Sequence, residues 1–241
     1  MVQDIAQKVL RLPPFPFNNN RLLEGLVFYA PLWHERAHLN GAMKSPFLTP
    51  DRFHHSATVT GTTLTRLTSG VDAPSFDGDD SISLTNNSIF NFISEDFSIL
   101  MWIKPSVITD TDYELFNRGV VAAEGYRFFH RNGGTQFWTL NGASQQTLSS
   151  LGMVVDTWYL VGVSRSGGSV ILYRNGVNTN STSGNHSNPT SNTRTAYIGV
   201  YTDGSSAHYS GIIGEVWVYK DKSLTAVEHQ QIYRTTKGRY G

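Results

Sequence analysis

The sequence predicts an all-β sandwich, and three observations carry that prediction. Apolar residues alternate with a period of two, most clearly over residues 97–103, where both faces of the strand are apolar and both are therefore expected to be covered. Turn dipeptides such as Asn132-Gly133 and Asn175-Gly176 separate short strands, because both central residues of a primed hairpin turn need a positive φ. A chain of 241 residues is long enough to fold as one sandwich domain. We expect helices only at the two ends of the chain.

The first 20 residues read as an arm that precedes the sandwich domain, which we place at residues 21–241. Apolar residues of the arm recur three and four positions apart and form a stripe along one side of a short helix: Val2, Ile5, Ala6, Val9 and Leu10. Pro13 and Pro14 end this helix. It is shorter than the roughly 12 to 15 residues at which an isolated helix becomes marginally stable in water, so the apolar stripe must pack against another surface. That surface is either the sandwich of the same chain, another copy of the chain, or a partner protein.

The apolar run 26–33 reads as a buried strand that ends at Pro31, and a motif resembling a zinc-peptidase signature follows it. In HERAHLNG, a helix would place His34 and His38 on one face to hold Zn²⁺, with the glutamate between them activating a water. Nearby glycine and prolines limit any such helix, and Lys44 stands where a third histidine ligand would be. We interpret the segment as a polar surface loop, with a zinc peptidase as the less favoured alternative.

Two further local signals lie in the second half of the chain. Residues 175–195 are rich in Asn, Ser and Thr and have few apolar anchors, which predicts an exposed loop or a weakly held edge. Thr225 and Glu228 have the spacing of a capping box, which predicts the start of a short C-terminal helix.

The composition excludes several classes of partner. Lys plus Arg equals Asp plus Glu at 19 each, and charged residues make up only 16% of the chain, so no electrostatic footprint for nucleic acid is present. No apolar run is long enough to insert into a membrane, and the N-terminal segment lacks the pattern of a signal peptide. The absence of cysteine excludes disulfides and thiolate chemistry. If the protein works outside a cell, we expect it to leave the cell by lysis or within a particle.

Five blocks carry a family resemblance and occur in a fixed order: PSFDGDDSISL (74–84), FSILMWIKPS (97–106), WYLVGVSRSGGSVILYRNGV (158–177), AYIG (196–199) and GIIGEVWVYKDKSLTAVEHQQIY (211–233). Together they resemble the laminin G-like and pentraxin-like branch of the concanavalin A-like lectin/glucanase superfamily. The resemblance implies a jelly-roll sandwich of two antiparallel sheets. With the arm and the lack of cysteine, it is also similar to laminin G-like domains of bacteriophage virions.

Calcium is the cofactor that this resemblance implies. Some laminin G-like domains bind Ca²⁺ through aspartates and backbone carbonyls, which makes Asp77, Asp80 and Glu215 candidate ligands. The chain departs from the pattern at Gly214, where many relatives have an aspartate. The alternative is that Asp77 and the following glycine simply form a tight turn.

Binding is favoured over catalysis. Hydrolases of this fold class need two carboxylates on one strand face, and the sequence contains no such array, so we assign no catalytic residue. A glycan-binding domain needs aromatic rings and a few polar groups on a rigid scaffold. The candidate ligand-binding residues are Tyr126, His130, Trp138, Tyr201, His208 and Tyr209, each of which has the alternative of a core aromatic; Trp102 and Trp158 are assigned to packing.

Two functional interpretations follow. The first is a non-catalytic, lectin-like structural protein that decorates a virion capsid or tail and binds glycans; the alternative is the carbohydrate-binding module of a polysaccharide-degrading system. Glycan-cleaving enzymes are less favoured. For the first interpretation we expect a location on a virion surface, or outside the cell without a signal peptide. By analogy with virion fibres, we expect the arm to hold a homo-oligomer, specifically a trimer.

Overall fold

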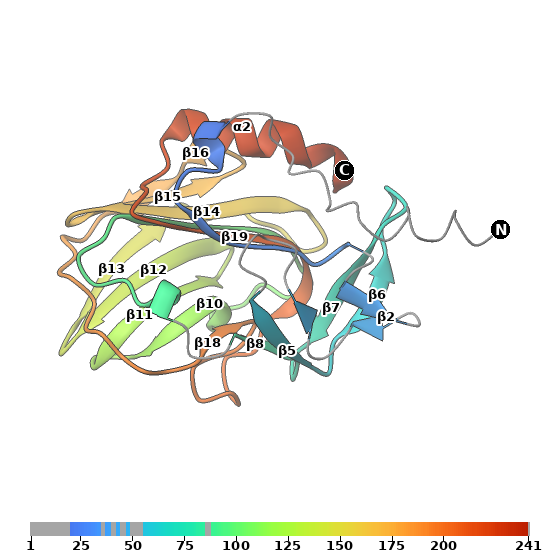
Figure 1. Ribbon diagram of the computed structural model, residues 1–241, viewed down its shortest axis with the longest axis horizontal. Helices are drawn as coiled ribbons and strands as arrows, with labels where there is room; N and C mark the ends of the chain where they lie inside the picture. Colours follow the sequence, from blue (N-terminus) through green and yellow to red (C-terminus); the bar gives the residue numbers. More distant parts are fainter. Residues whose placement is uncertain are drawn as a thin grey trace, which may run out of the picture.

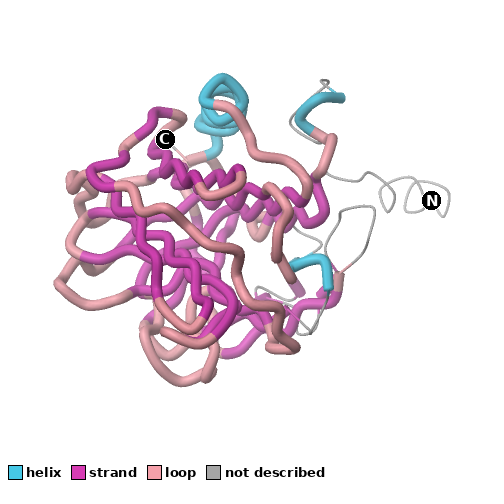
Figure 2. The backbone as a smooth tube through the Cα atoms, turned by 90° about the vertical axis from the view of Figure 1, so that its left-hand side faces the viewer, coloured by secondary structure: helices cyan, strands magenta, loops and turns pink. Residues whose placement is uncertain are grey.

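The computed structural model describes residues 20–34, 37–39, 42–43, 47–48, 55–84 and 88–240. Within them two large antiparallel sheets stack face to face as a jelly-roll sandwich, which confirms the predicted fold class (Figure 1). Figure 2 shows the strand layers with the C-terminal helix lying outside them. No helix among these residues is long and apolar enough to cross a membrane.

The first sheet has eight strands. In spatial order they are β16 (Val177–Asn178), β15 (Ser169–Arg174), β14 (Tyr159–Ser166), β9 (Phe97–Pro105), β19 (Ser210–Lys220), β7 (Asp72–Asp77) and β6 (Thr63–Arg66), with β1 (Leu26–Pro31) also paired to β19. Strands β7 and β1 both pair with β19, β7 along residues 210–212 and β1 along residues 215–219. Strand β19 also pairs with β9, with a register shift between Ile213 and Val216.

The second sheet has nine strands. In spatial order they are β17 (Asn180–Thr182), β13 (Ser144–Ser149), β12 (Gly134–Asn141), β11 (Glu124–Arg131), β10 (Tyr113–Val120), β18 (Ala196–Ile198), β8 (Ser81–Leu84), β5 (Ser56–Thr60) and β4 (Phe47–Leu48). The predicted hairpin turns are confirmed: Asn132 and Gly133 join β11 to β12, Asn175 and Gly176 join β15 to β16, and all four have positive φ. The predicted loop after β16 supplies the edge strand β17.

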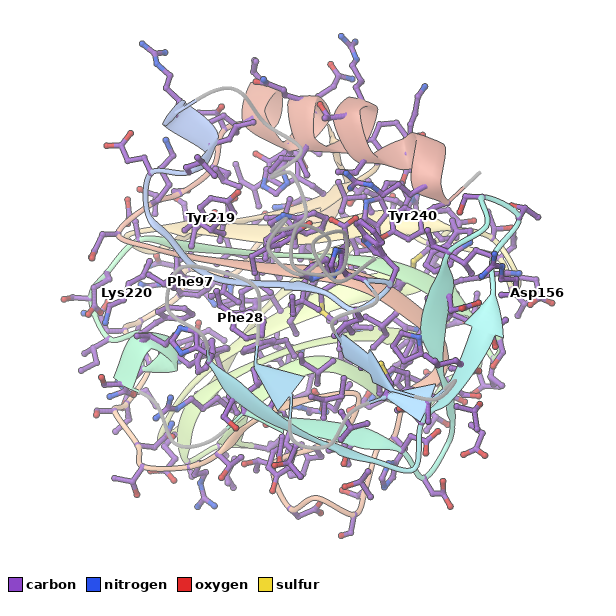
Figure 3. The ribbon with its side chains drawn as sticks, turned by 45° about the vertical axis from the view of Figure 1, so that its right-hand side comes forward. Phe28, Phe97, Asp156, Tyr219, Lys220 and Tyr240 are labelled. Atoms are coloured by element: carbon purple, nitrogen blue, oxygen red, sulfur yellow. The ribbon has the colours of Figure 1, made fainter. Side chains whose placement is uncertain are left out.

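Strand β9 shows how one alternating strand serves two cores. Its Phe97 and Ile99 point between the sheets, whereas Leu100 and Trp102 point to the other side of the eight-stranded sheet. Figure 3 shows this division: Phe28 and Phe97 lie between the layers, and Tyr219 and Tyr240 lie on the opposite side of the sheet. Each fully buried large apolar side chain stabilises the fold by roughly 1.5 to 3 kcal/mol relative to exposure. Both faces of β9 are buried, as its sequence predicted.

The C-terminal helix α2 (Ala226–Thr236) covers the outer face of the eight-stranded sheet. It begins with the predicted capping box, in which Thr225 Oγ1 accepts from the Glu228 amide and Glu228 Oε2 accepts from the Thr225 amide at 2.8 Å. His229 of α2 packs on β14, where a Cβ at Gly162 would lie 2.7 Å from the imidazole. Short 3₁₀ turns are η1 (Asn20–Leu22), η3 (Ser88–Phe90) and η4 (Lys237–Arg239).

Two expectations concern the N-terminal part of the chain. The predicted arm comprises residues 1–20, and its helix before Pro13 lies outside the described residues, which begin at Asn20. In the HERAH motif, His34 lies in a turn after β1, and His38 lies in β2 (His38–Leu39), which pairs with β3 (Ala42–Met43). Because His38 belongs to a strand, the two histidines do not share the helix face that a zinc peptidase needs.

Candidate functional site

The outer face of the nine-stranded sheet carries the site, because no described helix covers it (Figure 1). Strands β11 and β12 alternate across this sheet. Phe128 and Phe137 face the core between the sheets, so Arg127, Phe129 and Trp138 face outward.

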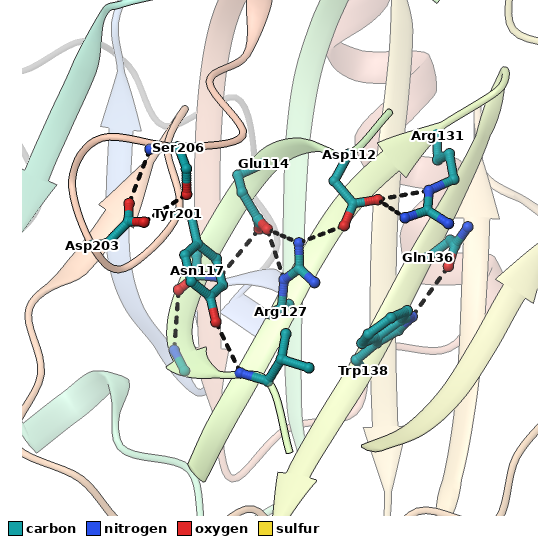
Figure 4. Close-up of polar contacts among 12 residues, drawn as sticks. Asp112, Glu114, Asn117, Arg127, Arg131, Gln136, Trp138, Tyr201, Asp203 and Ser206 are labelled. Atoms are coloured by element: carbon teal, nitrogen blue, oxygen red, sulfur yellow. Dashed lines mark hydrogen bonds and ion pairs between the residues drawn. The ribbon is translucent and has the colours of Figure 1, made fainter. Parts of the chain in front are cut away.

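Arg127 is the centre of this face, and its guanidinium is held by two carboxylates (Figure 4). Its Nε donates to Glu114 Oε1 at 2.7 Å, and its Nη2 contacts Glu114 and also donates to Asp112 Oδ2 at 2.9 Å. Arg131 Nε donates to the other oxygen of Asp112 at 2.7 Å, and Asn117 Nδ2 donates to Glu114 Oε2 at 3.2 Å. The side chain of Arg127 is only 4% exposed and that of Glu114 is fully buried. Such a charge-assisted network fixes the guanidinium in one orientation.

Three aromatic rings surround this guanidinium. The Cζ atom of Arg127 lies 4.4 Å from the ring centre of Phe129, 5.2 Å from that of Trp138 and 5.0 Å from that of Tyr201. Trp138 packs edge-to-face on Phe129, and its indole N–H donates to Gln136 Oε1 at 3.1 Å. We call Arg127, Phe129, Trp138 and Tyr201 the platform. Its Trp138 and Tyr201 are half-buried, so parts of both rings are open to solvent.

A tight loop positions Tyr201. Its hydroxyl accepts from the Val121 amide at 2.8 Å, and its own amide donates to the carbonyl of Ser206 at 3.0 Å. Asp203 holds the loop closed by accepting from the Ser205 amide at 2.8 Å and the Ser206 hydroxyl at 2.6 Å. Burial raises the pKa of Asp203, but the hydrogen bonds from Ser206 and Ser205 outweigh that effect and lower it. The carboxylate therefore stays charged, and the tyrosine ring is held in place.

The two carboxylates beneath the platform, Glu114 and Asp112, are engaged by arginines of the protein itself. Burial raises the pKa of Glu114 to about 7, against the opposing effect of the Arg127 charge and hydrogen bonds. Glu114 and Asp112 both use oxygens to hold Arg127. A glycosidase acid or base must instead reach the substrate oxygen or a water.

Of the six predicted ligand-binding residues, the structure brings Trp138 and Tyr201 together on one open face. Tyr126 and Tyr209 lie between the sheets with about 1% exposure or less, and the Tyr126 hydroxyl donates to the Phe90 carbonyl at 2.9 Å. These two tyrosines are therefore core aromatics, the alternative that the sequence left open for them. His208 lies elsewhere, with Nδ1 3.1 Å from the carbonyl oxygen of Asp80.

His130 is also in the core. It stacks on Tyr113 with ring centres 4.9 Å apart and meets Tyr209 edge-to-face at 5.7 Å. Burial lowers its pKa to about 4, and neither ring nitrogen has a hydrogen-bond partner among the described residues. The imidazole is therefore neutral at pH 7 and faces away from the platform.

The predicted calcium ligands are only partly together. Asp77, Asp79 and Asp80, which we call the aspartate cluster, offer carboxylate oxygens within 4.8 Å of one another. Asp80 is 3% exposed, and this burial raises the pKa of its carboxyl group. The pKa of Asp79 is raised by a hydrogen bond with Asp77 and by the negative charge of Asp77, as expected for neighbouring like charges. Three carboxylates would supply part of the six to eight oxygens that Ca²⁺ takes. One of them also closes the turn, since Asp80 Oδ2 accepts from the Asp77 amide at 2.8 Å.

Glu215 is not part of the aspartate cluster, contrary to its place in the predicted set. It is fully buried on the α2 side of the eight-stranded sheet, where its Oε1 accepts from Trp33 Nε1 at 2.7 Å, Arg239 Nη1 at 2.7 Å and the Tyr240 hydroxyl at 2.9 Å. Burial raises its pKa, and the charge of Arg239 opposes that shift. The carboxylate is an internal anchor for the C-terminal residues.

Sequence reasoning missed Arg127, Asp112 and Glu114. The available signal was Arg127 in the apolar strand YRFFHR, because a charge at an otherwise apolar position needs a partner. The partner carboxylates come from the preceding strand and its turn, which only the pairing of β10 with β11 identifies. Trp158, which the sequence assigned to packing, is partly buried and packs against the core on the α2 side of the eight-stranded sheet.

The model of the family described as the concanavalin A-like lectin/glucanases superfamily matches residues 76–228. No curated protein sequence matches this one.

Among solved structures, the binding domain of Paraclostridial Mosquitocidal Protein 1 has a TM-score of 0.64 and 16% identity, over 88% of this chain and 52% of that one. Domain 4 of AbnA, an extracellular arabinanase from Geobacillus stearothermophilus, in complex with arabinotriose, has a TM-score of 0.59 and 16% identity, over 86% and 98%. A structure of botulinum neurotoxin type C, whose cell entry depends on interaction with two ganglioside molecules, has a TM-score of 0.64 and 13% identity, over 90% and 52%. The chain spans about half the length of both toxin structures, and identities this low show the fold alone.

Proposed function

Since this chain belongs to the concanavalin A-like lectin/glucanase superfamily, we propose that it is a non-catalytic glycan-binding protein whose ligand lies on the platform. One observation carries the proposal: two partly open aromatic rings, Trp138 and Tyr201, flank a guanidinium that two carboxylates hold in place. A site of this kind is rigid before the ligand arrives, so little ordering entropy is lost on binding.

The platform suits a sugar chain on an open surface. The rings of Trp138 and Tyr201 offer apolar faces against which the C–H face of a pyranose or furanose can stack. Polar side chains border them: Gln146 is exposed and stands opposite Trp138 in the β12 and β13 pairing, and Arg131 is 38% exposed. These groups can hydrogen-bond sugar hydroxyls, whereas Glu114 and Asp112 are occupied by Arg127. Binding without cleavage is the chemistry that this arrangement supports.

The neighbouring structures support a binding role at the level of the fold. They include two toxin structures, one of them a binding domain, and an arabinanase domain in complex with arabinotriose. The virion-surface role, the location on a virion or outside the cell, and the trimer stay predictions. Calcium stays a prediction that depends on the aspartate cluster.

The test is binding of neutral oligosaccharides by calorimetry, with arabinotriose and short glucans, xylans and galactans as probes. Trp138→Ala should weaken binding of any bound probe by about tenfold or more, which is about 1.4 kcal/mol. Tyr201→Ala should weaken it as well, whereas Tyr201→Phe should bind as the parent does, because the hydroxyl of Tyr201 faces the Val121 amide. Val177→Ala, at an exposed apolar residue of β16 on the other sheet, is the control and should bind normally. Binding that Trp138→Ala leaves unchanged would move the ligand off the platform, and no binding of any probe would count against the proposal.

A further inference from the structure

A second aromatic site lies where the C-terminal residues return to the eight-stranded sheet. Six residues line a pocket of about 320 Å³ there: Trp102, Trp158, Tyr233, Lys237, Gly238 and Tyr240. This volume is at the lower end of the range of small-molecule sites. We propose that this pocket binds a carboxylated sugar, a hexuronate or a sialic acid, as a glycan site separate from the platform. The inference rests on the proposed function in that it assumes a glycan ligand.

The aromatic walls of the pocket are stacked on one another. The indole of Trp102 stacks on Tyr233, with ring centres 5.7 Å apart, and on Tyr240, with ring centres 4.5 Å apart, and each pair of rings is inclined by 26°. Trp158 packs against Tyr240, with ring centres 4.7 Å apart. The Trp102 indole N–H donates to Thr236 Oγ1 at 2.8 Å, so its ring is fixed to α2.

The buried Glu215 anchors the wall that the C-terminus forms. It accepts hydrogen bonds from both Arg239 and the hydroxyl of Tyr240. The strand beneath also leaves room for Tyr240, because a Cβ at Gly214 would lie 2.3 Å from the tyrosine ring. Figure 3 shows Tyr240 above the eight-stranded sheet, near the C-terminal end of α2. The departure from the family pattern at Gly214 therefore makes space for a pocket wall.

The charge at the rim selects an anion. Lys237 is exposed, its Nζ lies 5.8 Å from the ring centre of Tyr233, and no described carboxylate is paired with it. Aromatic pockets also suit quaternary ammonium ligands, but here a cation would meet the ammonium of Lys237 at short range. An anion gains from the same charge.

Both recognition elements of a carboxylated sugar are therefore present. Trp158 and Tyr233 are partly buried and line the pocket, where their rings can meet the C–H face of a pyranose. The indole N–H of Trp158 has no partner among the described residues and is available to a sugar hydroxyl. Lys237 is placed to meet the carboxylate with a charge-assisted hydrogen bond. A neutral sugar would use the rings but not the charge.

The test is an NMR titration of the full chain with sodium glucuronate, with N-acetylneuraminate and, for comparison, with glucose. At least one of the two acids should bind about tenfold or more tightly than glucose, and 0.5 M salt should weaken that binding because exposed charges are screened. Trp158→Ala should weaken it about tenfold or more, and Lys237→Gln about five- to tenfold. Arg234→Gln, which removes an exposed cation of α2 outside the pocket lining, is the matched control and should stay within about twofold.

The two proposals fail independently. Trp138→Ala removes a platform ring and should leave the affinity for the two acids unchanged. Trp158→Ala should leave the affinity of the platform for neutral oligosaccharides unchanged. Lys237 is exposed, so Lys237→Gln is expected to fold normally even if Trp158→Ala does not. Equal binding of glucose and both acids, an unaffected Lys237→Gln variant, loss of the acids in Trp138→Ala, or no binding of either acid would each overturn the inference.

Discussion

Replacing Arg127 by methionine tests the internal support of the platform. The substitution keeps an unbranched apolar stem but removes the guanidinium that Glu114 and Asp112 share. Asp112 keeps Arg131, which is partly exposed, so its charge remains compensated. Glu114 is fully buried and keeps only the amide of Asn117 as a side-chain donor. The variant therefore leaves a buried carboxylate without its counter-ion.

The expected loss follows from that burial. Removing one partner of a buried ion pair costs about 3 to 5 kcal/mol, because the remaining charge stays desolvated. In a domain of this size each kcal/mol lowers the melting temperature by about 2 to 4 °C, which gives a decrease of about 6 to 20 °C at pH 7. Burial already raises the pKa of Glu114, and loss of Arg127 removes the opposing effect, so the folded variant takes up a proton more readily. The deficit should therefore shrink as the pH falls from 8 to 5.

Urea unfolding followed by tryptophan fluorescence measures these free energies. Adding Glu114→Gln to Arg127→Met removes the buried charge and should restore more than half of the lost stability. Arg131→Met is the matched control: its side chain is 38% exposed and pairs with Asp112 alone, so the change should be below about 1 kcal/mol. The reasoning is wrong if Arg127→Met costs less than about 1 kcal/mol, or if the second substitution does not relieve the loss.

Three further predictions concern acid, metal and the arm. Burial lowers the pKa of His130 and His186 to about 4 and that of His229 to about 3, so between pH 6.5 and 4 the unfolded chain binds protons that the folded chain excludes. Each buried histidine should then cost up to about 1.4 kcal/mol per pH unit, partly offset by Glu114, and a melting temperature that does not fall over this range would contradict the assignment. If the aspartate cluster binds Ca²⁺, saturating calcium should raise the melting temperature and EDTA lower it, with Asp79→Asn as the variant that loses the effect; no shift would remove calcium. Deleting residues 1–20 should convert an oligomer into a monomer in sedimentation experiments, and two monomeric chains would exclude self-association through the arm.

The sequence by itself determined the local structure of this protein. Strand alternation in β9, the Asn-Gly turns and the capping box of Thr225 and Glu228 depend on residues within a few positions of one another, so their physics can be read along the chain. The five ordered blocks then led to the correct superfamily. These signals identify two faces of each strand, but they do not say which face another layer covers.

Only the tertiary structure decided which aromatic residues remain accessible. Tyr126 and Trp138 lie on neighbouring paired strands in similar sequence, yet one faces the core and the other faces outward. A register shift between Glu114 and Phe116 places Glu114 on the outer face beside Arg127, and nothing in the local pattern marks that shift. Glu215 and Tyr240 meet because the C-terminal residues fold back onto β19. Burial and ion pairing are properties of residues distant in sequence, which is the physical reason that the sites required the fold.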